Sequence, residues 1–192
     1  MLRLLTVIAL ALLAGPALAE PPDWIVAAGG CKVWNDDPKP NKKAIWTGKC
    51  VEGLAEGHGV VQWSLDDKPW GLDEGEYRRG KLSGHGVMAR ADGNRYEGEW
   101  RDGKKHGRGV LIYDGGSRYE GQFAEGEPWG TGTLQWLSGS RYQGGWRAGK
   151  PDGHGTYRTV DGQTYSGNFV NGCFSQGTFR AFIGTTMKDC GF

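Results

Sequence analysis

A fixed period of 23 residues constrains what this chain can fold into. Gly75, Gly98, Gly121, Gly144 and Gly167 follow one another at that step, and each is followed two residues later by an aromatic residue. A second pair of glycines keeps the same step, as Gly84-x-Gly86, Gly107-x-Gly109, Gly130-x-Gly132 and Gly153-x-Gly155. A repeat of roughly 20 to 50 residues indicates an architecture in which one supersecondary unit stacks on the next.

Each unit has the residue pattern of an antiparallel hairpin. Along residues 95–100 the side chains of Tyr96, Gly98 and Trp100 alternate with polar ones, which is the period of a strand with one buried face. The polar segment 101–106 predicts the hairpin loop, 107–113 the return strand, and 114–117 the turn into the next unit. After the N-terminal 19 residues no segment has helical periodicity, so the expected fold is all-β.

The repeated segment resembles the MORN (membrane occupation and recognition nexus) repeat. The copies that carry this resemblance are Tyr96-Glu97-Gly98-Glu99-Trp100, Tyr119-Glu120-Gly121-Gln122-Phe123, Tyr142-Gln143-Gly144-Gly145-Trp146 and Tyr165-Ser166-Gly167-Asn168-Phe169. The resemblance implies one elongated, single-layer antiparallel sheet of stacked β-hairpins, used for binding and not for catalysis. It also implies the partners of such proteins, which are membranes, phosphoinositides or protein scaffolds.

The repeat pattern divides the chain into four segments. A weaker copy lies at Asp73 to Tyr77, and a further copy, offset by 27 residues, begins upstream at Trp46. Residues 46–174 are therefore the expected repeat array. Residues 20–45 and 175–192 are expected to cap its two ends, because terminal repeats lack a neighbour to cover one edge. Residues 1–19 have a basic start, an apolar stretch and a small-residue site, which predicts a signal peptide cleaved after Ala19 and a periplasmic or secreted protein.

Four cysteines follow the predicted signal peptide. An even number of cysteines in an exported chain favours disulfide bonds. We expect Cys31 to pair with Cys50 and Cys173 with Cys190, because the two ends of a linear array lie far apart. Each bond would then staple one end of the array, and a zinc site is the less favoured alternative because the chain has no Cys-x-x-Cys motif.

The aromatic positions of the middle repeats have two interpretations. A glycine between two aromatics leaves bare backbone on which rings can lie, and the period would align these rings in a column down the sheet. The column is either the hydrophobic core, which we favour, or an exposed binding face. The candidate binding face consists of Tyr96, Trp100, Tyr119, Phe123, Tyr142 and Trp146.

The sequence offers no candidate for catalysis, for a cofactor or for a metal. Glycine and lysine spacings that imitate a phosphate-binding loop lack the following Ser or Thr, and they arise from the hairpin repeat itself. His58, His85 and His154 occupy equivalent positions in different repeats, too far apart to share one zinc ion. We therefore expect a protein that is not an enzyme.

The balance of basic and acidic residues limits the partners that the protein can attract. Removal of Arg3 with the signal peptide leaves 22 basic and 22 acidic residues, so attraction to nucleic acid is not expected. Glu97 and Glu120 should offset Arg95 and Arg118, whereas Arg141 has no acidic companion in its strand. The expected function is an exported interaction or scaffolding module of the bacterial cell envelope that binds a protein. The alternatives are a glycan or a membrane-lipid headgroup on the aromatic face, and self-association through the end strands remains open.

Overall fold

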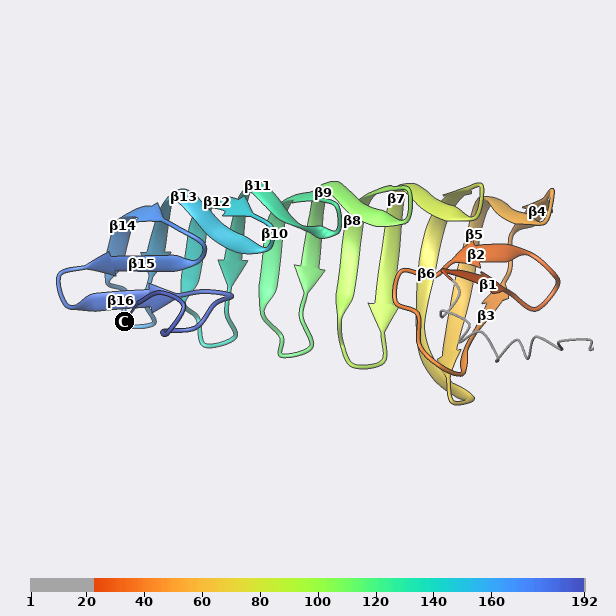
Figure 1. Ribbon diagram of the computed structural model, residues 1–192, viewed down its shortest axis with the longest axis horizontal. Helices are drawn as coiled ribbons and strands as arrows, with labels where there is room; N and C mark the ends of the chain where they lie inside the picture. Colours follow the sequence, from red (N-terminus) through yellow and green to blue (C-terminus); the bar gives the residue numbers. More distant parts are fainter. Residues whose placement is uncertain (1–22, 192) are drawn as a thin grey trace, which may run out of the picture.

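The computed structural model describes residues 23–191, and the predicted signal peptide with its cleavage site lies outside them. Within this range the chain forms strands and turns without any helix, so no helix there is long and apolar enough to cross a membrane. The strands make an elongated 14-stranded sheet and a separate two-stranded hairpin (Figure 1). The all-β fold of stacked hairpins predicted from the period is confirmed.

The strands follow one another in space almost as they do in sequence. From β5 onward each strand pairs antiparallel with the next, up to the last strand of the large sheet, β14. The strands are β1 Trp24–Val26, β2 Lys32–Trp34, β3 Lys42–Trp46, β4 Lys49–Val51, β5 Leu54–Leu65, β6 Lys68–Arg78, β7 Lys81–Arg90, β8 Arg95–Arg101, β9 Lys104–Ile112, β10 Arg118–Ala124, β11 Glu127–Gln135, β12 Arg141–Arg147, β13 Lys150–Arg158, β14 Thr164–Phe169, β15 Cys173–Gln176 and β16 Phe179–Phe182. One hairpin therefore advances the sheet by two strand spacings, about 10 Å.

The hairpin tips are tighter than the sequence pattern predicts. Between β8 and β9 only Asp102 and Gly103 form the turn, with φ of 52° and 79°, as a two-residue type I′ turn requires. The prediction of a loop over 101–106 is therefore wrong at its C-terminal side, where Lys104 already belongs to β9. The Gly103 amide donates to the carbonyl of Leu82 at 2.9 Å, which fixes this tip against the preceding hairpin.

Bulges bend the hairpins and give the sheet a concave side. The register of β8 and β9 shifts between Gly98 and Glu99, and equivalent shifts follow Gly75, Gly121 and Gly144. A β-bulge bends its strand and increases the local twist. Figure 1 shows the upper part of each hairpin curving over the same side of the sheet, and we call this concave side the trough.

Two caps cover the ends of the trough, and its middle is uncovered (Figure 1). At the N-terminal cap Trp24 and Trp34 meet edge to face at 5.4 Å. At the C-terminal cap the ring of Phe174 stacks on Phe169 at 4.6 Å and that of Phe179 on Tyr165 at 3.7 Å. Each ring pair replaces the neighbouring hairpin that a terminal repeat lacks.

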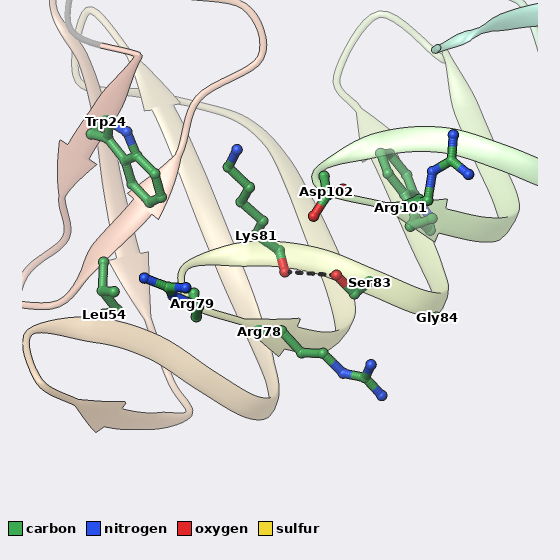
Figure 2. Close-up of a pocket in the computed structure, with 10 residues that line it drawn as sticks. Trp24, Leu54, Arg78, Arg79, Lys81, Ser83, Gly84, Arg101 and Asp102 are labelled. Carbon is green, nitrogen blue, oxygen red and sulfur yellow. Dashed lines mark hydrogen bonds between the residues drawn. The ribbon is translucent and has the colours of Figure 1, made fainter. Parts of the chain in front are cut away.

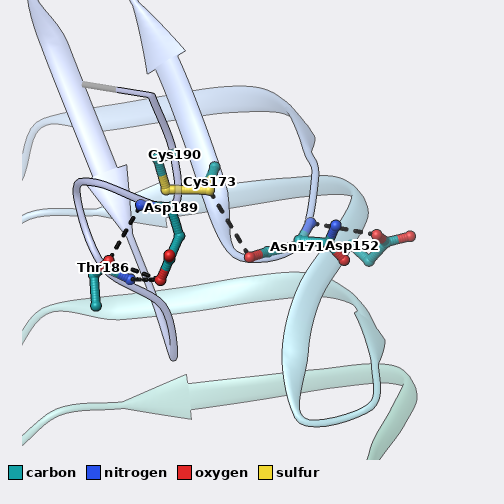
Figure 3. The surroundings of a disulfide bond; sticks show 6 residues. All are labelled: Asp152, Asn171, Cys173, Thr186, Asp189 and Cys190. Atoms are coloured by element: carbon teal, nitrogen blue, oxygen red, sulfur yellow. Dashed lines mark hydrogen bonds between the residues drawn. A yellow bond between two sulfur atoms is a disulfide. The ribbon is translucent and has the colours of Figure 1, made fainter.

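Both predicted disulfide bonds are present. Cys31 bonds to Cys50 at the N-terminal cap, and Cys173 bonds to Cys190 at the other end. Figure 3 shows how the second bond ties the C-terminal segment to the start of β15, next to a turn closed by Thr186 donating to Asp189 at 2.7 Å. The disulfides therefore fix both caps to the array, as the stapled-end prediction requires.

Candidate binding surfaces

The six aromatic rings of the candidate binding face lie in the interior of the trough. Their exposed fractions run from 0% for Tyr96, Tyr119 and Tyr142 to 6% for Trp100. Each tyrosine ring meets a ring of its own strand and one of the next hairpin edge to face; Tyr96, for example, contacts Trp100 at 5.1 Å and Phe123 at 5.0 Å. This burial favours the interpretation of the column as hydrophobic core.

The polar atoms of these rings are used inside the protein. The hydroxyls of Tyr96 and Tyr142 donate to the carbonyls of the bulge residues Glu99 and Gly145 at 2.9 and 3.0 Å. The indole of Trp100 donates to a backbone carbonyl of the preceding hairpin at 3.1 Å. Burial also raises the pKa of Tyr142 to about 12. We call the six rings the column rings; they have no free donor with which to bind a ligand.

The opposite, convex face of the sheet carries paired charges over the central repeats, beside the exposed ring of Trp129. The Arg95 guanidinium pairs with Glu97, and that of Arg118 pairs with Glu120, both at 2.6 Å. Arg141 instead donates to neutral partners, with Gln143 at 3.3 Å. The predicted self-neutralised columns are therefore present, and they leave little net charge to attract an anion.

The N-terminal end of the convex face has exposed apolar side chains. The cross-strand row there runs Ile45, Gln62, Leu72 and Ala89 and continues to Arg95, so one polar residue stands between Ile45 and Leu72. Ile45 is 51% exposed and Leu72 is 37% exposed, beside a hollow of about 530 Å³ lined by these residues and Pro69. We call Ile45, Leu72, Ala89 and Pro69 the apolar patch.

A second set of aromatics stands outside the core along the trough. One of them, Trp70, lies under the N-terminal cap, with the ammonium groups of Lys39 and Lys42 at 4.7 and 4.4 Å from its ring centroid. Trp70, Tyr113 and Trp136 are half-buried and pack against the core from its rim. Within residues 23–191 their indole N–H and hydroxyl groups make no hydrogen bond, and none of these atoms is buried without a partner. We call these three the rim rings; their donors face solvent.

Charged side chains line the trough beside Trp70 and Tyr113. A hollow of about 370 Å³ is bordered by Asp36 of the N-terminal cap and by Lys105 and Glu127 of the array. None of these three has a hydrogen bond or ion pair through its side chain in the described part of the chain. Burial lowers the pKa of Lys105, and the nearby carboxylates of Asp36 and Glu127 oppose that shift.

A buried polar cluster closes the trough at its N-terminal end. The Lys42 ammonium donates to Asn35 at 2.6 Å and lies over the rings of Trp63 and Trp70 at 4.5 and 4.4 Å. Burial lowers its pKa, and the cap carboxylates oppose that shift. All the strong donors of this cluster are therefore engaged, and it serves to anchor the cap.

Basic residues at the hairpin tips do not form an anion site. Arg78, Arg79, Lys81 and Arg101 border a pocket beside Trp24, but in Figure 2 the three arginine side chains point in different directions. The Lys81 ammonium already lies over the ring of Trp34, 4.4 Å from its centroid. These cations do not converge on a phosphate-sized ligand. Among residues 23–191, moreover, no group of three His, Cys, Asp or Glu side chains is placed to hold a metal ion.

Sequence reasoning did not single out the rim rings or Lys105. Tyr113 and Trp136 are spaced by the same 23 residues as the glycines, which is a signal that could have found them. Lys105 stands where the equivalent return strands have Leu82, Pro128 and Pro151, so a charge interrupts an apolar column. The caps, which decide which part of the trough stays open, have no repeat signal.

Comparison with known proteins agrees with the repeat pattern. The family model of the MORN repeat matches residues 51–64, 74–95, 96–118, 119–141 and 142–164. No curated protein matches the chain. Among solved structures, the SAS-4 (dCPAP) TCP domain of Drosophila melanogaster, in complex with a proline-rich motif of Ana2 (dSTIL), is 11% identical. The match covers 88% of this chain and 99% of that one with a TM-score of 0.36, too low to support an argument.

Proposed function

The chain belongs to the MORN repeat family, and from this we propose that it is an exported binding module that scaffolds a protein partner in the bacterial cell envelope. MORN repeats are binding modules and not catalytic domains. The two disulfide bonds support the exported location, because such bonds persist in oxidising compartments. Cleavage after Ala19 remains part of this proposal, and N-terminal sequencing of the secreted protein tests it.

The apolar patch is the observation that carries the choice of a protein partner. In the cross-strand row of the convex face the exposed Leu72 and Ile45 occupy the N-terminal end, whereas Arg118 and Arg141 occupy equivalent places further along. Exposed apolar side chains that gather around one hollow and are rimmed by polar ones are typical of a protein interface. Nothing in the fold requires Leu72 to be apolar, because the same position is arginine in the later repeats.

The substitution Leu72→Arg tests this proposal, because it installs the residue that later repeats have there. Protein captured from a periplasmic extract on the wild type would be identified by mass spectrometry, and its affinity would then be measured with purified components. We expect the affinity to fall about tenfold or more with Leu72→Arg, as for a central interface residue. The control Gln135→Arg, in the same row, should bind like the wild type. Equal binding by both variants would contradict the proposal.

A glycan ligand is the second candidate, and the rim rings favour it. The column rings are interior, so an aromatic binding face inside the trough consists of Tyr113 and Trp136. A membrane-lipid headgroup has less support, because the basic residues at the hairpin tips diverge. Self-association would use the free edge of β14, the last strand of the large sheet.

A further inference from the structure

Lys105 shows that the floor of the trough is not optimised for stability alone. Its position faces inward, and the equivalent residues Leu82 and Pro128 are both buried. Within residues 23–191 the Lys105 ammonium has no ion-pair partner, and it lies over the ring of Tyr96, 5.9 Å from the ring centroid. A partly desolvated lysine costs stability unless it interacts with something. A ligand in the trough would supply that interaction.

The rim rings offer the other half of a ligand site. Tyr113 and Trp136 each present an apolar ring face and an unused donor, which are the features of aromatic side chains that bind amphipathic ligands. The ring of Trp70 is already covered by the cations of Lys39, Lys42 and Arg90. Tyr113 and Trp136 follow the ends of β9 and β11, one hairpin apart, so their backbones are separated by two strand spacings, about 10 Å. The free carboxylates of Asp36 and Glu127 add hydrogen-bond acceptors to the same wall.

A sugar chain has the chemistry that matches this set of groups. The C–H face of a pyranose ring stacks on an aromatic ring, and its hydroxyls need both donors and acceptors when they leave water. In a β-1,4-linked chain every second sugar presents the same face, so the chain repeats by disaccharides, comparable in length to one hairpin step. Opposite charges around the hollow exclude a strongly anionic chain, because Asp36 and Glu127 would repel it.

We propose that the trough between the two caps binds a β-1,4-linked chain of N-acetylhexosamines. The sugars stack on Tyr113 and Trp136. Lys105 donates to the carbonyl of an N-acetyl group, whose methyl packs on the apolar floor at Leu111. This site is separate from the apolar patch on the convex face, so it does not depend on the protein partner proposed above.

The test is calorimetric titration of the disulfide-bonded, exported protein with the hexamer of N-acetylglucosamine. Trp136→Ala and Tyr113→Ala should each weaken binding about tenfold, the effect expected for losing one aromatic contact. Lys105→Leu should weaken binding while raising the thermal midpoint, because it restores the apolar column. Trp129→Ala, which removes a 46% exposed tryptophan of the convex face, is the matched control and should change nothing.

Three results would overturn the proposal. The first is the absence of binding by the hexamer at millimolar concentration, and the second is equal weakening by Trp129→Ala and Trp136→Ala. The third is a different preferred ligand. Binding of cellohexaose as tight as that of the N-acetylglucosamine hexamer would contradict the N-acetyl assignment. Tighter binding of a proline decamer would mean that the ligand is a peptide and not a sugar. Should Trp136→Ala disturb the neighbouring cap, Trp136→Phe keeps a smaller aromatic ring there and removes the indole N–H donor, and it must still weaken binding.

Discussion

The trough contains two sets of aromatic side chains that differ in how their polar atoms are used. The column rings are at most 6% exposed, and the hydroxyl of Tyr96 donates to a carbonyl of its own hairpin. The rim rings, such as Tyr113, are half-buried, and their donors have no partner in residues 23–191. The comparison teaches that aromatic content alone does not locate a binding face in a repeat sheet, because most of the rings are core.

The largest expected effect is loss of stability when a column ring is removed. Trp100→Ala should lower the free energy of unfolding by about 3 to 5 kcal/mol, the usual cost of truncating a buried tryptophan. Trp136→Ala should cost clearly less, because its ring is already half-exposed. Thermal and urea unfolding of both variants measure the difference, and equal losses would erase the distinction between the two sets.

A methyl group added at a column glycine should have the next largest effect. A Cβ at Gly98 would stand 2.5 Å from the Cα of Gly109 and 2.6 Å from the hydroxyl of Tyr96. We expect Gly98→Ala to cost about 1 to 3 kcal/mol through overpacking. Gly115→Ala is the control, because nothing lies within 4 Å of that position. An unchanged unfolding curve for Gly98→Ala would show that the rings do not lie on bare backbone.

Removing one hydroxyl group from a column ring and one from a rim ring compares the two sets directly. Tyr96→Phe deletes a donor that is bonded at 2.9 Å and should cost about 1 kcal/mol of stability. Tyr113→Phe deletes a hydroxyl that has no hydrogen-bond partner among residues 23–191, so the unfolding midpoint should stay unchanged. A destabilised Tyr113→Phe variant would mean that the rim hydroxyl has a structural role.

The smallest expected effect is a delayed ionisation of the column tyrosines at alkaline pH. Burial raises the pKa of Tyr142 to about 12, above its ordinary value of 10.0, so its contribution to stability is complete below pH 10. This contribution is lost as the pH rises through 12, because the folded state keeps a proton that the unfolded state releases. Phenolate absorbance should therefore show a late-titrating group that moves to lower pH on unfolding, and a single unshifted transition would contradict the burial.

The sequence predicted the repeat fold well because each unit contains the residues that determine its own strand pairing and turn. Gly98 and its equivalents pair across strands, and Asp102-Gly103 is a strong type I′ turn signal that the polar run 101–106 obscured. The pairing of Cys173 with Cys190 followed from the linear shape. The binding surfaces were harder to predict from the sequence, because they depend on exceptions to the repeat. These are Lys105 in an apolar column, Leu72 in a polar row, and caps that have no repeat period.

Hydrogen exchange of the individual indole N–H groups tests the division between column and rim most directly. NMR spectra of the unmodified protein would resolve these protons, assigned by Trp→Phe substitutions. We expect the N–H groups of Trp100 and Trp146 to be protected, because they donate to backbone carbonyls at 3.1 and 3.2 Å. Those of Trp70 and Trp136 should exchange rapidly with water. Slow exchange at Trp70 and Trp136, or rapid exchange at Trp100 and Trp146, would contradict the account.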